Sequence, residues 1–522
     1  MPVKMKDISA LNWFHETKPS FAFLVSNFWQ GVCQSKKFLE IPDPMAGGVL
    51  SSVPDTQPDE INDLLAEMEK CPIYGLHNPL HNPGRYAHLG EVCFKAAAAL
   101  SEKENADYFA RLISISVPKD YKQAMGEVEI TARFLKTFCG NNVRFLGKGE
   151  TIPGDEEGYE GIHYPWPFGP VAIIAPFNFP LEIPALQLMG ALFMGNKPVL
   201  KPDPRVAIVA DAFLRLLWGC GLPTTDVCLL NGGGEVAEKL VTAKKANGDY
   251  LIQMVQFTGS TGVARRLAVV TEGRVRFEDS GLGWKILGPN FLDEDISQVV
   301  EQCDKDAYSA SAQKCSAQKF LFPHRKWLKK DLYLALIELE ADRKLGDLTI
   351  GATVTWSNQR LYEHSQKVLK IERAKLLWGN ASFVPPAGCE GYGYMMPTAI
   401  EVPLDKIRQY FDIVTTEVFA PFQLVIPWET DEELEQIISF LNDLPRHLTA
   451  AVVDRDKSFC QKILSRTKPG VTYAGIKAPT TGTPEWLHFG PTSHPADCGI
   501  GTPEAIIRTW SQPRLICRRE DG

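Results

Sequence analysis

One stretch of the chain repeats a short apolar strand followed by a helix, and no other feature constrains the fold as strongly. The predicted strands are Val171–Ala175, Pro198–Lys201, Asp226–Leu230 and Met254–Ser260, and a helix such as Ala207–Trp218 separates each from the next. Strands that are apolar throughout and separated by single helices are typical of a parallel sheet covered on both faces. Because crossovers between such strands are right-handed, this stretch predicts an α/β, doubly wound, Rossmann-like domain.

The segments around this domain differ from it in pattern. Apolar residues at helical spacing predict helices over Asn105–Ser116 and Lys122–Cys139, whereas residues 148–167 have no periodicity, which indicates a connector or an exposed arm. A second α/β pattern begins near Arg276, and the apolar segment Ala505–Trp510 predicts a last strand. The length of the chain is typical of two or three domains.

Composition and charge exclude several classes of protein. Of the 522 residues, 44% are hydrophobic and 23% are charged, which is typical of a globular protein. The formal net charge of −8, with Lys and Arg scattered, argues against a nucleic-acid-binding protein. The apolar run Ile183–Gly195 is too short to span a bilayer and is typical of a buried helix. The amino-terminal sequence resembles neither a signal nor a transit peptide, so we expect a cytosolic protein or a chain whose leader is absent.

Twelve cysteines are spread along the chain, and one of them has an unusual setting. None belongs to a C-x-x-C pair or to a Cys/His cluster with zinc spacing, so the sequence predicts free thiols, a reducing compartment and no metal site. Cys315 lies within Ser309–Phe320 among small and polar residues, whereas a structural cysteine usually lies among apolar ones. A reactive thiol needs an open, polar approach, so Cys315 is a candidate nucleophile, while its neighbour Lys314 has no evident role.

Polar residues at the ends of the predicted strands are candidates for a nucleotide site. Gly259 and Ser260 open a helix directly after a strand, where free N–H groups bind phosphate, although a plain strand–helix turn fits equally well. Lys201 ends another strand and either binds ribose hydroxyls or is solvated. Asn178, in a Pro-rich turn, is an oxyanion donor or a turn residue, and Glu278 is a general base or a solvated acid.

Taken together, six short motifs in one order resemble the aldehyde dehydrogenase superfamily between Pro165 and Pro421. They are PFNFPL, KP, FTGS, an acidic residue before Gly, QKCS and TTEVFAPF. Longer segments over nearly the whole chain, among them GEVEITARFLKTFCG and DAYSASAQKCSAQ, resemble the plant type of Δ1-pyrroline-5-carboxylate dehydrogenases. This resemblance implies an enzyme of proline catabolism in the mitochondrial matrix that oxidises L-glutamate γ-semialdehyde to L-glutamate with NAD.

The resemblance also implies the architecture of the family. We expect an NAD-binding domain over residues 1–147 and 164–277, a catalytic domain over 278–498, and a small β arm over 148–163 and 499–522. The arm would bridge the subunits of a homo-oligomer, either a dimer or a tetramer. The expected partners are a small aldehyde substrate and other copies of this chain, with no nucleic acid and no membrane.

In the mechanism that the resemblance implies, Cys315 attacks the aldehyde to form first a thiohemiacetal and then a thioester. Asn178 and the backbone N–H of Cys315 match the family's oxyanion donors, and Glu278 matches the base that activates water. The family's usual E-L-G-G reads E-D-S-G here, from Glu278 to Gly281. Asp279 therefore remains an alternative base, with Glu278 favoured.

The cofactor residues that the resemblance implies fall in the same motifs. Lys201 and Glu417 match the residues that bind the two ribose rings. Pro204 occupies the position where many relatives place an acid that binds the adenosine ribose, so the preference for NAD over NADP rests on the resemblance. The other matches contact the pyrophosphate, the nicotinamide ribose or the wall of the cleft: Ile174, Pro176, Phe177, Gly259, Ser260 and Phe419.

The substrate implied by the resemblance has a carboxylate of its own, which needs donors away from the thiol. Ser316 matches a serine that binds this group, and Gly499 and Gly501 predict a nest of backbone N–H groups. Phe138 and Phe179 are predicted to pack against the aliphatic part of the substrate, although Phe138 fits equally well as a core aromatic. The alternatives left open are a dehydrogenase of another carboxylated or small aldehyde, an inactive homologue and a cofactor-free cysteine hydrolase.

Overall fold

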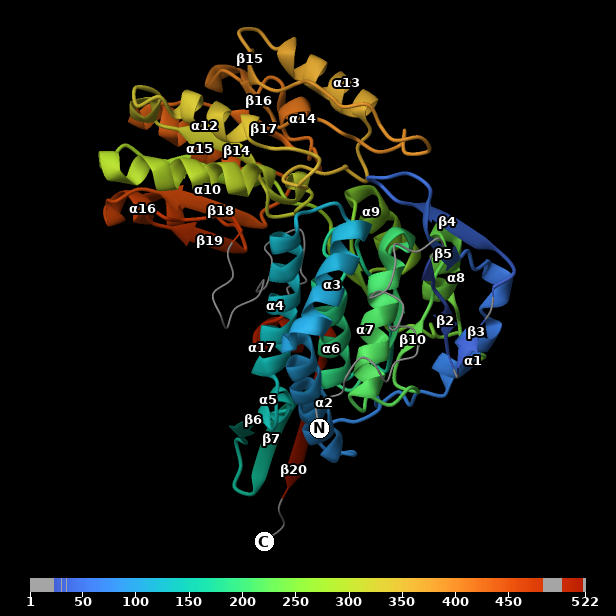
Figure 1. Cartoon of the computed structure of the whole chain (residues 1–522). Coiled ribbons are helices and arrows are strands. Elements are labelled where there is room, and N and C mark those ends of the chain that lie inside the picture. Colours follow the sequence, from blue (N-terminus) through green and yellow to red (C-terminus); the bar gives the residue numbers. More distant parts are fainter. Residues whose placement is uncertain (1–22, 30, 34, 482–499, 520–522) are drawn as a thin grey trace.

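Two sheets, each seven-stranded within the described residues, form the body of the protein, and a small sheet extends from it (Figure 1). This arrangement is that of a computed structural model, which describes residues 23–29, 31–33, 35–481 and 500–519. The second of the two large sheets and its helices lie at the top of the view, and the small sheet lies at the bottom.

The first large sheet has the strand order β12-β11-β8-β9-β10-β2-β3, with parallel pairing from β12 to β10. The predicted parallel, doubly wound sheet is therefore confirmed, and a short antiparallel pair at its edge is added to it. The strands are β2 (Asn27–Phe28), β3 (Val32–Cys33), β8 (Pro170–Ile174), β9 (Lys197–Lys201), β10 (Cys228–Leu229), β11 (Met254–Thr258) and β12 (Val275–Glu278).

Helices cover both faces of this sheet because each crossover between its strands passes through one. The predicted helices at Asn105–Ser116 and Lys122–Cys139 are present as α3 and α4. Among the described residues, no helix has the length and apolar character needed to cross a membrane. The helices of this half are α1 (Asn62–Glu69), α2 (Gly84–Ser101), α3 (Lys103–Ser116), α4 (Tyr121–Thr137), α5 (Asn142–Leu146), α6 (Glu182–Phe193), α7 (Ala207–Gly219), α8 (Gly234–Thr242) and α9 (Thr261–Val270).

The second large sheet has the strand order β15-β16-β17-β14-β13-β18-β19, parallel except for the edge pair of β15 and β16. Its strands are β13 (Gly283–Leu287), β14 (Gln318–Pro323), β15 (Lys375–Trp378), β16 (Thr398–Glu401), β17 (Phe422–Val425), β18 (Thr449–Val453) and β19 (Val471–Ala474). Its helices are α10 (Ile296–Tyr308), α11 (Arg325–Leu328), α12 (Leu332–Ala341), α13 (Asn358–Leu369), α14 (Phe411–Val414), α15 (Asp431–Asn442) and α16 (Lys457–Leu464).

Two smaller sheets complete the fold. The segment without periodicity in the sequence forms β6 (Glu150–Pro153) and β7 (Tyr159–Trp166), and β20 (Gln512–Arg519) pairs with β7 along its whole length. Segments far apart in the sequence are thereby joined in one antiparallel sheet that projects from the body (Figure 1). The other small sheet consists of β1 (Phe23–Leu24), β4 (Phe38–Pro42) and β5 (Val49–Pro54).

The prediction of a strand at Ala505–Trp510 is wrong, because this segment lies in helix α17 (Pro503–Trp510). The Thr502 hydroxyl accepts a hydrogen bond from the Ala505 N–H at 3.1 Å, and a proline in the first turn has no N–H to satisfy. Ile506 and Trp510, one helical turn apart, are both buried and pack in the same core as α6. The helix therefore packs against α6, beside the first large sheet, although it falls within the range predicted for the arm.

Candidate active site

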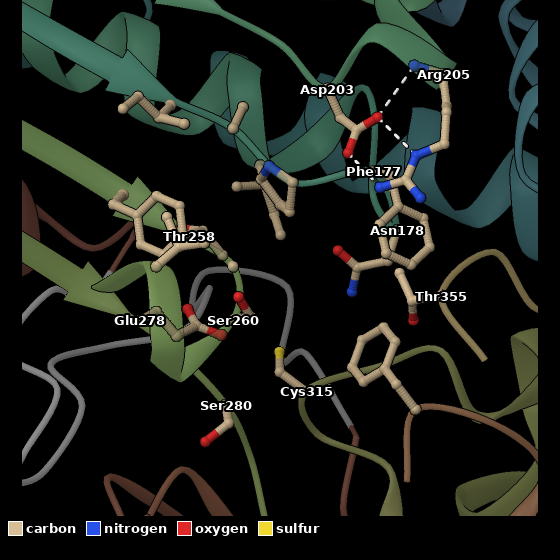
Figure 2. A pocket seen from close by; sticks show the side chains of 18 of the residues that line it. Phe177, Asn178, Asp203, Arg205, Thr258, Ser260, Glu278, Ser280, Cys315 and Thr355 are labelled. Atoms are coloured by element: carbon tan, nitrogen blue, oxygen red, sulfur yellow. Dashed lines mark hydrogen bonds and ion pairs between the residues drawn. The ribbon is translucent and has the colours of Figure 1, made fainter. Parts of the chain in front are cut away.

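A cavity of about 440 Å³ lies where the carboxyl ends of the first sheet's strands meet the loop that carries Cys315 (Figure 2). Both halves of the chain contribute to its walls, with Phe177 from the first half and Thr355 from the second. It is lined by eleven of the residues that the sequence predicts for catalysis or cofactor binding: Ile174, Pro176, Phe177, Asn178, Lys201, Gly259, Ser260, Glu278, Cys315, Glu417 and Phe419.

Cys315 follows a tight turn after α10 and precedes β14. The turn contains three consecutive residues with left-handed backbone, Ala310, Ser311 and Ala312, whose φ angles are 54°, 53° and 55°. This conformation is unfavourable for residues with a Cβ and persists only where the surroundings impose it. Here the Gln123 side chain accepts a hydrogen bond from the Ala310 N–H at 2.7 Å, and the Ser311 hydroxyl accepts one from the Gly351 N–H at 2.7 Å.

Asn178 lies in the turn between β8 and α6, on the opposite side of the cavity from Glu278 (Figure 2). Its side-chain amide donates a hydrogen bond to the Gln313 carbonyl oxygen at 3.1 Å. Gln313 is itself fixed, because its side-chain amide donates to the Ala352 carbonyl and accepts from the Val354 N–H, at 3.1 and 2.7 Å. The amide has a second N–H, so Asn178 is attached to the cysteine loop and still has one donor for a ligand.

Glu278 ends β12 with only 4% of its surface exposed, and its Oε1 atom has no hydrogen-bond partner within the described part of the chain. Burial raises the pKa of this carboxyl, and the nearby Cys315 thiol opposes that rise. The pKa of the Cys315 thiol is raised well above its usual value, first by burial and then by the charges of Glu278 and Glu417. The resting thiol is therefore protonated beside a carboxyl group that can accept its proton.

Asp279, the alternative base, has a different environment. Its side chain is buried away from the cavity and forms an ion pair with the Arg446 guanidinium. Successive residues at the end of a strand point to opposite sides, which separates the two adjacent acids. Only Glu278 of the two lines the cavity with Cys315.

Glu417 and Gly281 connect the two walls of the cavity. The Gly281 N–H donates to Glu417 Oε1 at 2.8 Å. Burial raises the pKa of Glu417 to about 7, and the Gly281 N–H and the Lys319 ammonium oppose that rise. A Cβ atom at Gly281 would overlap the backbone carbonyl of Cys315, so only glycine allows the two segments to lie this close.

The nucleotide half of the cavity has features that suit a dinucleotide. Ser260 is the N-cap residue of α9, and its side chain makes no capping hydrogen bond. The free N–H groups of that helix terminus and the Lys201 side chain at the end of β9 lie along the same cavity. A helix N-terminus and a lysine therefore lie along one cavity, an arrangement that suits an anionic ligand with hydroxyl groups.

The sequence model of the aldehyde dehydrogenase family matches residues 29–491. The chain belongs to the aldehyde dehydrogenase family. It is 44% identical to the mitochondrial Δ1-pyrroline-5-carboxylate dehydrogenase 12A1 of Arabidopsis thaliana. The match extends over 481 residues, which are 92% of this chain and 84% of the relative. A "Probable aldehyde dehydrogenase" of Linum usitatissimum is 43% identical over 499 residues, 95% of this chain and 88% of its own.

Solved structures agree with this assignment at the level of the fold. The methylmalonate-semialdehyde dehydrogenase of Oceanimonas doudoroffii has a TM-score of 0.81 at 19% identity, over 96% of this chain and 99% of its own. The two large sheets and the projecting small sheet therefore form the aldehyde dehydrogenase fold.

Several residues predicted for the substrate do not line the cavity. Phe138 packs in the helical core against Phe134 and Phe193, with ring centroids 5.2 and 4.9 Å away, so its position is that of the core aromatic that the sequence also allowed. Phe179 is half-buried, and its ring lies 4.6 Å from the Lys119 ammonium. Gly501 is buried with a φ of 90°, and Gly499 lies outside the described residues.

Ser316 and Lys314, on either side of Cys315, are both buried. The Ser316 hydroxyl shares a hydrogen bond of 2.7 Å with the Thr481 hydroxyl, and neither residue is among those that line the cavity. Burial lowers the pKa of Lys314 to about 8, and the charges of Asp306 and Cys315 oppose that change. An amine with such a pKa can exchange a proton near neutral pH.

The structure adds cavity residues that sequence reasoning missed. Asp203 and Arg205 form a two-fold hydrogen-bonded ion pair on the loop after β9, at 2.8 and 2.6 Å, and the guanidinium lies 5.0 Å from the centre of the Phe177 ring (Figure 2). An acid and a base two residues apart at a strand end are a signal that could have been used. Thr355 and Trp356, from the loop before α13, and Arg360, in the first turn of α13, also line the cavity, but this segment has no motif of its own.

Proposed function

We propose that this protein oxidises L-glutamate γ-semialdehyde to L-glutamate with NAD. The observation that carries the proposal is that Cys315, Glu278 and Asn178 meet in one cavity with a nucleotide cleft. The substrate is supported by the identity of 44% to a relative named as a Δ1-pyrroline-5-carboxylate dehydrogenase. The same relative is named as mitochondrial, which supports a location in the mitochondrial matrix.

The first step is attack of the Cys315 sulfur on the aldehyde carbon. The thiol proton passes to Glu278, the sulfur–carbon bond forms, and negative charge develops on the former carbonyl oxygen. The remaining N–H of the Asn178 amide and the backbone N–H of Cys315 donate to that oxygen. The product of this step is a thiohemiacetal on Cys315.

The second step converts the thiohemiacetal to a thioester. When bound, NAD supplies the acceptor for the hydride that leaves the thiohemiacetal carbon. Ser260 and Gly259 would hold the pyrophosphate at the start of α9, and Lys201, at the end of β9, and Glu417, in the loop before β17, would hold the two riboses, because all four residues line the cavity. The hydrophobic wall of Ile174, Pro176, Phe177 and Phe419 excludes water while the hydride moves.

The third step releases the acid. Glu278 accepts a proton from a water molecule, the resulting oxygen attacks the thioester, and the Cys315 thiolate leaves. The carboxylate must be ionised for this step, so the proton that it takes up in the first step has to leave the cavity before water is activated. The overall reaction consumes an aldehyde, one NAD and one water, and gives a carboxylate, NADH and protons.

The substrate's own carboxylate requires donors on the other side of the thiol. Ser316, Gly499 and Gly501 remain our candidates for this site, with Phe179 against the aliphatic chain. Support comes from the place of Ser316 directly after Cys315 in the chain and from its hydroxyl, which is paired with another hydroxyl, that of Thr481.

We further propose that the sheet of β6, β7 and β20 is an arm that joins subunits of a homo-oligomer. Apolar side chains on this sheet are exposed in the single chain: Ile152 by 49%, Tyr159 by 37% and Leu515 by 51%. An exposed sheet with large apolar residues is a typical subunit contact. We also propose that residues 1–147 and 164–277 form the cofactor-binding domain and that residues 278–498 form the catalytic domain.

The test is NADH formation with a panel of aldehydes: glutamate γ-semialdehyde, glutarate semialdehyde, butanal and propanal, each with NAD and with NADP. We expect the highest kcat/KM for glutamate γ-semialdehyde with NAD, and no activity in the Cys315→Ala variant. Turnover of simple alkyl aldehydes without turnover of glutamate γ-semialdehyde would replace the substrate assignment with that of another aldehyde.

A further inference from the structure

A buried ion pair lies beneath the turn that carries Asn178. Lys119 directly precedes the N-cap residue of α4, and Glu127 is on the second turn of that helix. The Lys119 Nζ and Glu127 Oε2 atoms are 2.8 Å apart, and each side chain is 1% exposed. Neither residue lines the cavity.

Each member of the pair holds a different part of the turn. The Lys119 ammonium donates a second hydrogen bond to the backbone carbonyl of Asn178 at 3.1 Å. The Glu127 Oε1 atom accepts from the N–H groups of Leu181 and Glu182, at 2.8 and 3.1 Å. These N–H groups open α6 and would otherwise be unsatisfied in a buried helix terminus. The main chain is therefore fixed on both sides of the Phe179-Pro180 segment.

Stability alone explains this buried ion pair poorly. Removing two charges from water costs several kcal/mol per ion, and well-packed apolar residues often replace such a pair without loss. A role in positioning the backbone explains the pair better, because both side chains make hydrogen bonds to the backbone of one short turn. The Phe179 ring lies against the ammonium, which restricts the turn further.

We propose that Lys119 and Glu127 are positioning residues that hold the Asn178 amide in the direction required for oxyanion stabilisation. The inference rests on the proposed function, in which Asn178 is an oxyanion donor. The Lys119 ammonium donates to the backbone carbonyl of Asn178. The Asn178 side-chain amide donates to the carbonyl of Gln313, in the loop that carries Cys315. A donor held at both ends loses little orientation when the substrate oxygen becomes charged, which is the condition for effective electrostatic catalysis.

The test uses Lys119→Met/Glu127→Gln, which removes both charges together, and measures the single-turnover rate of NADH formation. We expect a loss of about tenfold or more, toward the roughly hundredfold loss that follows removal of an oxyanion donor. The affinity for NAD and the rate at which iodoacetamide alkylates Cys315 should not change, because neither depends on Asn178. The single variant Glu127→Gln keeps the hydrogen bond from Lys119 to the Asn178 carbonyl and should lose less.

A matched control is available in the same half of the chain. The Lys197 ammonium and Glu67 Oε1 form another buried pair at 2.7 Å, at the start of β9 and away from the cavity. Lys197→Met/Glu67→Gln should lower the melting temperature without changing the single-turnover rate. An equal loss of rate in both double variants would show a general effect of buried charges and overturn the inference.

A double-mutant cycle that combines Lys119→Met/Glu127→Gln with Asn178→Ala separates this inference from the proposed function. If the pair acts through Asn178, its removal has little further effect once the amide is gone. A full additional loss in the Asn178→Ala background, or a wild-type rate in Lys119→Met/Glu127→Gln, would overturn the positioning role alone. An unchanged rate in Asn178→Ala itself would overturn the oxyanion role and the positioning role together.

Discussion

The Cys315 thiol and the Glu278 carboxyl line the same cavity, and burial raises the pKa of both groups. Glu278→Gln removes the negative charge beside the sulfur, so the pKa of the thiol should fall. We expect the pH profile of iodoacetamide alkylation to shift to lower pH, with a rate at pH 7 roughly three- to tenfold higher. A profile that does not move, or that moves to higher pH, would show that the carboxylate does not face the thiol.

Gly281 lies against the carbonyl of Cys315, and Gly281→Ala should displace the nucleophile. We expect a loss of kcat of at least about a hundredfold with a folded protein, because displacement of a reacting group by about 1 Å has an effect of that size. Circular dichroism and steady-state kinetics test this. Gly126→Ala is the control, because a Cβ there meets open space within α4 and should stabilise the helix by about 0.5 kcal/mol.

Asp279 pairs with Arg446 outside the cavity, so Asp279→Asn should affect folding more than chemistry. We expect a loss of up to about 3 kcal/mol of stability, since the variant leaves a buried guanidinium without its counter-charge. The measurements are the melting temperature and the burst of NADH in the first turnover. A normal melting temperature combined with a lost turnover would assign the base to Asp279 instead of Glu278.

Glu182, at the start of α6, is a buried acid near Glu127 and Glu278. Burial and then the Glu127 charge raise its pKa to about 8, against a usual value of 4.5. Its protonated form favours the folded state, so its contribution is full below about pH 4.5 and is lost as pH rises to about 8. Glu182→Gln should therefore gain in melting temperature relative to the wild type between these limits. A constant difference across pH would contradict the raised pKa.

Lys201, Gly259, Ser260 and Glu278 were predictable as candidates because they follow or end predicted strands, and the ends of parallel strands converge at one edge of a sheet. Glu417, Phe419 and the residues of the cleft wall were predicted from the family resemblance. Phe138 and Ser316 show the limit of this reasoning. Helical spacing at Phe138 does not tell whether that face meets the core or the cavity. Ser316 follows Cys315 directly, yet its hydroxyl is hydrogen-bonded to Thr481 and it is not among the residues that line the cavity. Such directions depend on packing between distant segments, which sequence patterns do not contain.

The segment Ala505–Trp510 shows a second limit. Its apolar residues satisfy a strand pattern over a few positions, and the decisive signals are the capping threonine and the proline just before it. Arg205 and Trp356 lie in the same cavity although about 150 residues separate them in the chain, a contact between loops that no local pattern predicts.

The most direct test of the account is to trap the thioester. The Glu278→Gln variant, incubated with glutamate γ-semialdehyde and NAD, should form NADH once and then stop, because water is no longer activated. That single turnover should be slower than in the wild type, because the thiol has also lost its proton acceptor. Mass spectrometry should find the acyl group on the peptide that contains Cys315, and it should find none when NAD is omitted. Glutamate release at the wild-type rate, or an acyl group on another residue, would contradict the assignment of Cys315 and Glu278.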